Sequence, residues 1–250
     1  MSKINFIATG CSFTAGIIPL PHSSPQEWND RGSVWPHFCF AKTDTAQSKF
    51  VNLALHGGGN TAAIYNLIYY LITNRSSLDK SNTIIGLNIT GLERIDRLVD
   101  LSEPDINQDM CCIDTSGLKH PSKDLGFGWV TKGPYGPQGG PQRKNYINGC
   151  LAILQGLCYL DHAGYEYFFM TMNDEIYTHA PAWFQQCLND RRDRWITFDD
   201  AQSMLTLVKK LNLTKSDTDW HPSTNGHKLI AQHVLDFCHR KYGTQFFNNI

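Results

Sequence analysis

The sequence predicts an α/β fold in which a central parallel β-sheet is covered by helices on both faces. Short apolar runs typical of buried strands alternate along the chain with longer segments whose apolar residues recur at helical spacing. The chain of 250 residues is long enough to bury such a sheet. No linker divides it, so we expect one domain that spans residues 1–250.

Four apolar runs of strand length are expected to form the sheet, and a shorter run is a candidate fifth strand. The four runs are residues 4–8, 50–55, 83–89 and 165–172, and the shorter one is residues 195–198. Turn-forming residues end the first two runs: Thr9-Gly10 follows the first, and three glycines follow the second after His56. Such turns are typical of the step from a strand to a helix.

Four segments are expected to be helices because apolar residues or capping residues recur in them at helical positions. They are residues 60–73, 146–162, 199–211 and 223–242. Asn60 or Thr61 is the expected N-cap of the first helix, and an Asp is that of the third. Gly243 is expected to end the last helix, because glycine readily adopts the left-handed conformation found there.

Two segments lack this alternation and are expected to be insertions, at about residues 17–48 and 97–145. Proline is frequent in the first, and glycine and proline in the second. Long irregular segments within a compact domain are usually functional or mobile, so we expect both to line or cover a site. Aromatic residues in these insertions are candidates either for stacking on a carbohydrate or for packing the insertion itself: Trp28, Trp35, Trp129 and Tyr135.

Composition argues against several classes of function. The net charge is −1, so no basic excess points to nucleic acid and no polybasic run points to an anionic membrane. No apolar stretch can span a bilayer and no signal-peptide core is present, so a cytoplasmic protein is expected. The eight cysteines form no CxxC pair or zinc spacing. We expect mostly reduced core thiols, as at Cys150, Cys158 and Cys238, and no metal or cofactor.

A serine follows the first expected strand in the segment TGCSFTAG, residues 9–16. Ligands of open parallel sheets bind at the carboxyl ends of the strands, where Ser12 is expected to lie. A serine that opens a helix has backbone N–H groups beside its hydroxyl, and these can hold an oxyanion. The pattern differs from the GxSxG elbow, because Thr14 stands where that motif needs glycine. The alternative is that Ser12 is only a helix N-cap.

A histidine, His221, stands directly before the last expected helix, and Pro222 keeps it out of that helix. Histidine exchanges a proton readily near neutral pH, and a carboxylate is needed to orient its ring. Residues two apart on an extended loop point the same way, so Asp219 is favoured, whereas Asp217 needs a local bend. The alternative is a capped helix with an incidental histidine. His227, in the first helical turn, is interpreted as structural.

Two of these segments resemble sequence blocks of the SGNH (GDSL-like) hydrolase family. Residues 10–16 resemble its first block, Gly-Asp-Ser-Leu-Thr-x-Gly, and residues 219–227 resemble its last, Asp-x-x-His-Pro followed by Gly-His. Here the aspartate lies two residues before the histidine instead of three. The resemblance implies a flavodoxin-like, three-layer α/β/α sandwich with Ser12 as nucleophile, His221 as base and Asp219 as the residue that orients the base.

The second strand and its turn, residues 52–60, resemble the family's second block. In that block a glycine after the strand donates its backbone N–H to the oxyanion, and only glycine allows so close an approach. Gly57 is the best match, and Gly58 is the next. The resemblance therefore implies that Gly57 contributes one oxyanion donor.

The third block, Gly-x-Asn-Asp in the family, is where this sequence departs most. Asn88 stands two residues after a glycine, but Ile89 replaces the aspartate. The resemblance implies Asn88 as a further oxyanion donor, with Thr90 and Asn173 as alternatives.

Together these features predict a serine esterase of SGNH type that hydrolyses a short acyl ester through an acyl-enzyme. The expected substrate is a small-molecule or carbohydrate ester, with a carbohydrate O-acetyl group as the commonest theme of the family. Two alternatives stay open. An acyltransferase would use the same three residues with an alcohol acceptor, and a non-catalytic binding module would keep only the fold. The sequence does not indicate an oligomeric state.

Overall fold

A computed structural model describes residues 3–15, 34–44, 46–55, 57–92, 94–100, 111–112, 127–132, 143–198 and 201–247. At its centre lies a four-stranded sheet in the order β2-β1-β3-β7, and all neighbouring strands in it are parallel. The strands are β1 (Asn5–Thr9), β2 (Lys49–Asn52), β3 (Thr83–Ile89) and β7 (Glu166–Thr171). The four predicted strands are confirmed, with some ends shifted.

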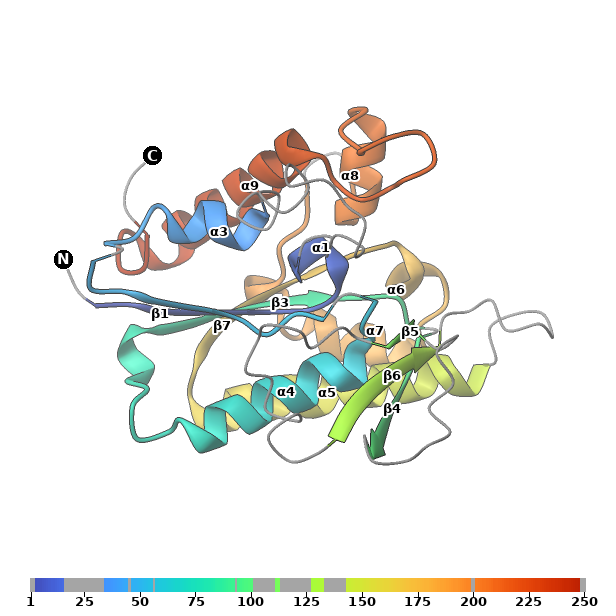
Figure 1. Cartoon of the computed structure of the whole chain (residues 1–250), viewed down its shortest axis with the longest axis horizontal. Coiled ribbons are helices and arrows are strands. Elements are labelled where there is room, and N and C mark those ends of the chain that lie inside the picture. Colours follow the sequence, from blue (N-terminus) through green and yellow to red (C-terminus); the bar gives the residue numbers. More distant parts are fainter. Residues whose placement is uncertain are drawn as a thin grey trace.

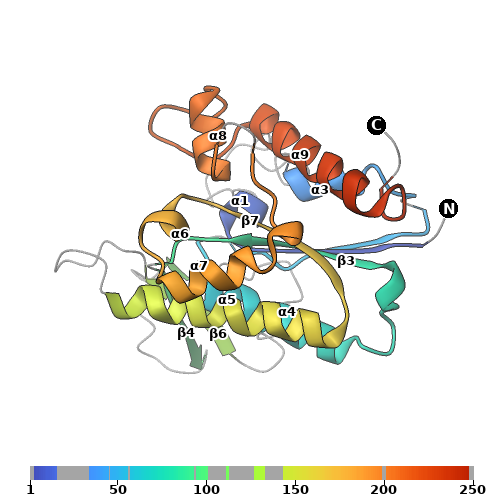
Figure 2. The ribbon, with the colours of Figure 1, turned by 180° about the vertical axis from the view of Figure 1, so that it is seen from behind.

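The sheet is covered on both faces (Figures 1 and 2). On one face lie α3 (Trp35–Phe40), α8 (Met204–Lys210) and α9 (Thr224–Tyr242). On the other lie α4 (Asn60–Thr73), α5 (Arg143–Ala163) and α7 (Ala182–Asn189). Alternate strand residues enter opposite cores: Phe6, Ile84 and Phe168 enter the first, and Ile7, Ile85 and Tyr167 the second. The predicted three-layer α/β/α architecture is confirmed.

The strand order creates a point where the chain changes direction across the sheet. From β1 the chain passes to β2 on one side, and then to β3 on the other side of β1. Ligand sites of open α/β sheets lie outside the carboxyl ends of the strands at such a point. The four-residue helix α1 (Ser12–Ala15) begins there, directly after β1. A second short helix, α6 (Glu175–Thr178), follows β7.

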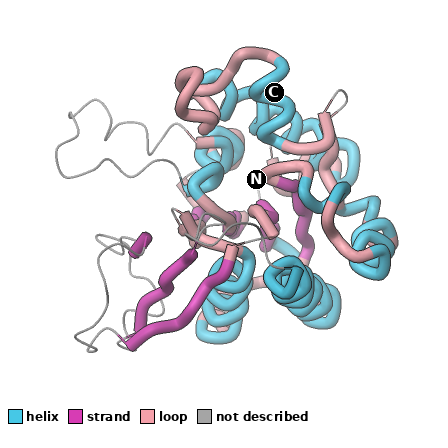
Figure 3. The backbone as a smooth tube through the Cα atoms, turned by 90° about the vertical axis from the view of Figure 1, so that its right-hand side faces the viewer, coloured by secondary structure: helices cyan, strands magenta, loops and turns pink. Residues whose placement is uncertain are grey.

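A small second sheet lies within the predicted insertion at 97–145, which was expected to be irregular. Its strands β4 (Ile95–Asp100), β6 (Phe127–Lys132) and β5 (Cys111–Cys112) pair antiparallel in the order β4-β6-β5. Figure 3 shows the β4–β6 pair beside the main body of the molecule. Its strands come from distant parts of the segment, so the pairing left no local signal.

The other predicted insertion, at 17–48, contains α3 in its described part. Trp35 opens this helix and is fully buried, with its ring packed near those of Phe6 and Phe168. Stacking of Trp35 on a carbohydrate is therefore wrong, and the residue packs the core instead. The side chains of the other three aromatic candidates lie outside the described residues. The extent of a single domain over residues 1–250 stays a prediction.

The predicted helices occur, with three corrections at their ends. The first helix, α4, is capped by Gly59 and not by Asn60 or Thr61. The third, α8, starts at Met204 after Ser203, whose hydroxyl accepts a hydrogen bond from the Thr206 N–H. The helix α5 begins a few residues before the predicted position. The last helix, α9, ends at Gly243 with a φ of 61°, as predicted.

Residues 195–198 do not form a regular strand. They contribute one parallel bridge, between Phe169 and Trp195, at the edge of β7. The run is too short and too apolar for its periodicity to distinguish a strand from a buried loop.

Six of the eight cysteines are described as free thiols: Cys11, Cys39, Cys150, Cys158, Cys187 and Cys238. Cys150 and Cys238 are buried as predicted, and burial raises the pKa of Cys150 to about 12. Cys158 is exposed, so its predicted place in the core is wrong. Within the described ranges, no helix is long and apolar enough to cross a membrane.

Candidate active site

The turn between β1 and α1 presents Ser12 at the carboxyl end of β1. Gly10 makes this turn possible, because its φ of +146° is a conformation that residues with a Cβ rarely adopt. The N–H groups of Thr14 and Ala15 both donate to the Cys11 carbonyl, at 2.8 and 2.9 Å, so the helix starts at Ser12. No hydrogen-bond acceptor for the Ser12 N–H occurs among the described residues.

The loop before α9 carries His221 and is held by its own backbone. The Ser223 N–H donates to the Leu213 carbonyl at 2.8 Å, and the Lys215 N–H donates to the His221 carbonyl at 2.8 Å. The Asp219 N–H donates to the Ser216 hydroxyl at 2.9 Å. These bonds close the loop on itself and bring it over α1.

A chain of hydrogen bonds joins residues that lie more than 200 positions apart. The Ser12 Oγ is 2.8 Å from His221 Nε2, and His221 Nδ1 is 2.6 Å from Asp219 Oδ1. The backbone N–H of His221 also donates to Asp219 Oδ1, at 3.1 Å. The ring of Phe13 lies against that of His221, with 5.3 Å between centroids. The structure thus brings together Ser12, His221 and Asp219, the three residues predicted to form the catalytic group.

The charge of Asp219 determines the direction of these bonds. Partial burial alone raises the pKa of its carboxyl, but hydrogen bonds from His221 outweigh burial and hold the pKa below its ordinary value. An ionised carboxylate only accepts hydrogen bonds, so Nδ1 of His221 carries a proton and donates it. In the neutral ring, Nε2 is then an acceptor, and the Ser12 hydroxyl donates to it. A general base needs this tautomer.

Asp217, the alternative partner, is exposed, and no contact between it and His221 occurs among the described residues. The two-residue spacing of Asp219 and His221 places their side chains on the same side of the loop, as expected for extended backbone. The geometry therefore favours Asp219 over Asp217 as the residue that orients the ring.

Gly57 lies in a turn that follows β2 by a few residues. The turn is closed by the Gly58 N–H, which donates to the Leu55 carbonyl at 3.0 Å. Gly57 has a φ of +71°, a left-handed conformation that glycine adopts most readily. Leu55 in turn donates its N–H to the Gly10 carbonyl at 3.0 Å. This bond connects the Gly57 turn to the turn that presents Ser12.

Asn88 lies within β3 and is fully buried. Its amide donates to the Thr14 hydroxyl at 3.1 Å, and its Cβ lies under Gly10, where an added Cβ would come within 2.8 Å of it. A side chain that solvent does not reach, and whose amide already has an acceptor, is placed to support the Ser12 turn. This placement favours a supporting role for Asn88 over the predicted role as an oxyanion donor.

The two alternatives to Asn88 are placed differently. Thr90 follows β3 and is buried, its N–H donates to Asn60 Oδ1 at 2.9 Å, and its hydroxyl lies 3.6 Å from the Met172 sulfur. Asn173 follows β7, is partly buried, and also has an interaction partner. Neither is linked to Ser12 by a hydrogen bond in the part of the chain that the structure describes.

Sequence analysis missed Arg94 and Asp96, which contact the glycine turn. Arg94 Nη1 donates to the Gly58 carbonyl at 2.9 Å, and Asp96 accepts from the Gly59 N–H at 2.8 Å. The available signal was a pair of opposite charges two residues apart after β3, a spacing that places both on one side of an extended segment. That spacing alone does not indicate that the two side chains bind the Gly58–Gly59 peptide group.

His227, interpreted as structural, lies on the first turn of α9 and is buried. Burial, together with the nearby charges of Lys215 and His221, lowers its pKa to about 3. In the unfolded chain an ordinary histidine titrates near 6.5, so between pH 6.5 and 3 the unfolded state binds more protons. The contribution of His227 to stability is therefore complete above pH 6.5 and is lost as the pH falls.

We expect the free energy of unfolding to fall by about 1.4 kcal/mol per pH unit below pH 6 because of His227. His227→Gln removes this titration. The free energy of unfolding of the variant should therefore fall less steeply with decreasing pH than that of the wild-type protein, by about 1.4 kcal/mol per pH unit. Urea unfolding of both proteins between pH 7.5 and 4.5 measures the difference. Equal slopes for the two proteins would contradict the assignment.

Comparison with solved structures finds this fold in an esterase and weaker similarity to other proteins. The esterase EstA from Pseudoalteromonas sp. superposes with a TM-score of 0.51 at 13% identity, over 94% of this chain and 97% of EstA. A lipase/acylhydrolase from Enterococcus faecalis gives a TM-score of 0.44 at 11% identity, over 94% of this chain and 95% of the lipase. A Bacillus subtilis protein, YXIM, gives a TM-score of 0.49 at 11% identity over 98% of this chain. This chain spans only 58% of the length of YXIM.

The fold is thus that of SGNH (GDSL-like) esterases and lipases, as the resemblance predicted. Searches of family models and of curated proteins match nothing to this sequence. The agreement with EstA is therefore one of fold.

Proposed function

We propose that this protein is a serine esterase that hydrolyses a short acyl ester through a covalent acyl-enzyme. The observation that supports the proposal most strongly is the hydrogen-bonded chain from Asp219 through His221 to Ser12. A hydroxyl is a weak nucleophile at neutral pH and needs a base within hydrogen-bond reach, which His221 provides. The fold shared with the esterase EstA adds support.

In the first step the Ser12 Oγ attacks the ester carbonyl, and His221 Nε2 accepts the hydroxyl proton. Asp219 accepts the Nδ1 hydrogen bond and stabilises the imidazolium. The backbone N–H groups of Ser12 and Gly57 donate to the oxyanion of the tetrahedral intermediate. Collapse of this intermediate breaks the ester bond, and the departing alcohol takes the proton from His221.

In the second step water attacks the acyl-enzyme, and His221 takes one of its protons. Collapse of the second tetrahedral intermediate releases the carboxylic acid and returns the proton to Ser12. If an alcohol or sugar hydroxyl replaces water, the same residues transfer the acyl group to it. Product analysis in the presence of a sugar acceptor distinguishes hydrolysis from transfer.

Labelling with a fluorophosphonate probe tests the proposal. A phosphonate forms a covalent bond with an activated serine, and EstA itself is described as inhibited by monoethylphosphonate. We expect wild-type protein to be labelled and to hydrolyse an aryl acetate, and Ser12→Ala to do neither. Mass spectrometry of the labelled peptide should place the adduct on Ser12. A wild-type protein that is folded but neither labelled nor active would favour a non-catalytic binding module.

A further inference from the structure

The segment around Gly57 is fixed on its N-terminal side by the nucleophile turn. Leu55 donates its N–H to the Gly10 carbonyl at 3.0 Å and accepts from the Gly58 N–H at 3.0 Å. Among the described residues, the Gly57 N–H has no hydrogen-bond acceptor of its own. The direction of this N–H therefore depends on how the flanking peptide groups are held.

On the C-terminal side, a carboxylate from β4 caps the helix α4. Asp96 Oδ1 accepts from the Gly59 N–H and Oδ2 from the Ala62 N–H, both at 2.8 Å. These are the N-cap and third positions of α4, so Asp96 acts as a capping side chain supplied from outside the helix. Negative charge at a helix N-terminus is stabilising. An added Cβ at Gly59 would lie 2.7 Å from either carboxylate oxygen, so the glycine leaves room for Asp96.

Arg94 holds the Gly58–Gly59 peptide group, the same one that Asp96 holds, by its carbonyl end. Its Nη1 donates to the Gly58 carbonyl at 2.9 Å, a contact that no helix cap requires. Asn60 adds a further connection: its Oδ1 accepts from the Thr90 N–H at 2.9 Å. The segment from Thr90 to Asp96 therefore contacts three consecutive residues after Gly57.

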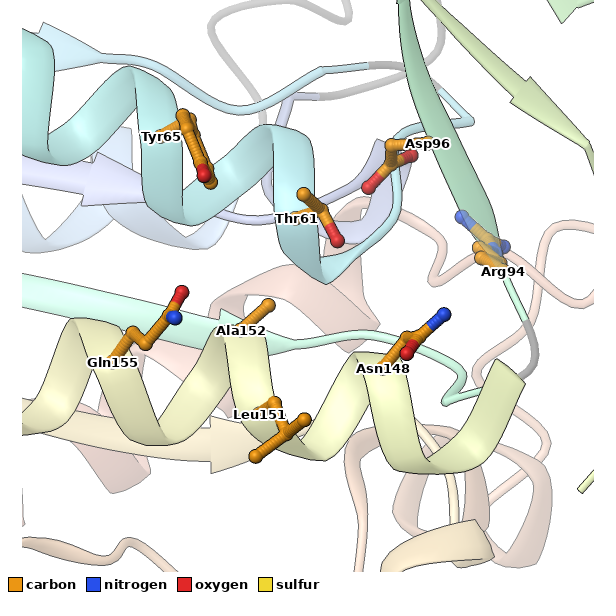
Figure 4. Close-up of a pocket in the computed structure, with 8 residues that line it drawn as sticks. All are labelled: Thr61, Tyr65, Arg94, Asp96, Asn148, Leu151, Ala152 and Gln155. Atoms are coloured by element: carbon orange, nitrogen blue, oxygen red, sulfur yellow. The ribbon is translucent and has the colours of Figure 1, made fainter. Parts of the chain in front are cut away.

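Arg94 and Asp96 also line a cavity of about 270 Å³ between α4 and α5. Figure 4 shows Asp96 beside Thr61 at the first turn of α4, and Arg94 at the same end of the cavity. Ser12, Asp219 and His221 are not among the residues that line it. The link from Arg94 and Asp96 toward Ser12 in the described part of the chain therefore runs through the glycine turn.

We propose that Arg94 and Asp96 are positioning residues that orient the Gly57 N–H toward the oxyanion. This inference rests on the proposed function, because it assigns a role only if an oxyanion forms at Ser12. A donor aimed at the transition state raises kcat, whereas it contributes little to binding of the ground-state ester. Loss of its orientation should therefore lower kcat more than it raises KM.

Asp96→Asn tests this role with little change of shape, because the carboxamide presents an NH2 group to one of the two N–H donors. Loss of a complete oxyanion donor lowers kcat by about 10²-fold to 10³-fold. For this displaced donor we expect a loss of about tenfold to a hundredfold, with KM little changed. Gly59→Ala, which pushes the carboxylate away and keeps its charge, should act in the same direction. Arg94→Met should also lower kcat, and Arg94→Lys should recover part of the loss.

Asp79→Asn is the matched control. Asp79 also caps a short helix, Lys80–Asn82, by accepting a hydrogen bond from the Ser81 N–H at 3.0 Å. This helix directly precedes β3, at the amino end of the strands, whereas Ser12 lies at their carboxyl end. We expect Asp79→Asn to keep the wild-type kcat and rate of fluorophosphonate labelling. Thermal unfolding of each variant ensures that rates are compared between folded proteins.

The outcomes separate this inference from the proposed function. If the wild-type protein is not labelled, the proposed function fails. If the wild-type protein is labelled but Asp96→Asn and Gly59→Ala both keep its kcat, the positioning role is wrong. A loss of kcat in Asp79→Asn as large as in Asp96→Asn would also contradict it, because the effect would then follow from loss of a cap alone.

Discussion

The His221→Ala variant is expected to hydrolyse an aryl acetate about 10⁴-fold to 10⁶-fold more slowly than the wild-type protein. His221 is the only side chain within hydrogen-bond distance of the Ser12 Oγ in the described part of the chain, at 2.8 Å. Without it, Ser12 has no base to take its proton and no acid to protonate the leaving alcohol. Initial rates at saturating ester concentrations measure the loss.

The two neighbouring aspartates provide a matched pair of variants. Asp219→Asn should lower kcat by about 10⁴-fold, because an amide presents its NH2 group to Nδ1 and favours the wrong tautomer of His221. Asp217→Asn makes the same chemical change at an exposed residue two positions earlier and should keep the wild-type kcat. The reverse result would assign the orienting role to Asp217, and unchanged rates in both would argue against a triad.

Gly10→Ala is expected to destabilise the folded protein by about 3 kcal/mol or more. The φ of +146° is strained for alanine, and the new Cβ would lie 2.8 Å from Asn88 Cβ and 2.9 Å from the Asn88 carbonyl oxygen. Backbone of a central strand moves only at a high cost, so the Ser12 turn has to shift instead. The midpoint of urea unfolding measures the destabilisation.

Gly164→Ala is the control for backbone strain alone. Gly164 also has a positive φ, +73°, but an added Cβ there meets no atom within 4 Å. The substitution should cost only about 1–2 kcal/mol, the usual penalty for a left-handed residue with a Cβ. A Gly10→Ala variant no less stable than Gly164→Ala would show that β3 and the Ser12 turn are not packed as tightly as the structure indicates.

Much of the fold was predictable because its signals are local. The residues 83–89 are a buried strand that the apolar pattern delimits, and β3 has the same bounds. The helix α4 likewise occupies the predicted residues 60–73, because its apolar face repeats every three to four positions. The contact between Asp219 and His221 was also predictable, because two residues on an extended loop need no long-range information.

Errors occurred where a distant residue decides the outcome. The N-cap of α4 was misplaced because its cap comes from Asp96, more than thirty positions away. The role of Asn88 as an oxyanion donor stays a prediction, and only the structure shows that its side chain binds Thr14 beneath the Ser12 turn. Trp35 was a candidate for a binding surface, but it is buried in the core near the rings of Phe6 and Phe168.

By itself the sequence determined the order of strands and helices and the two ends of the candidate site, because hydrophobic periodicity and short motifs act within a few residues. Only the tertiary structure decided that Ser12 and His221 meet, at 2.8 Å, and that the Gly57 turn lies between Gly10 and the Arg94–Asp96 segment. The reason is physical: hydrogen bonds and burial depend on which surfaces the sheet brings together, and the local pattern of residues does not contain that information.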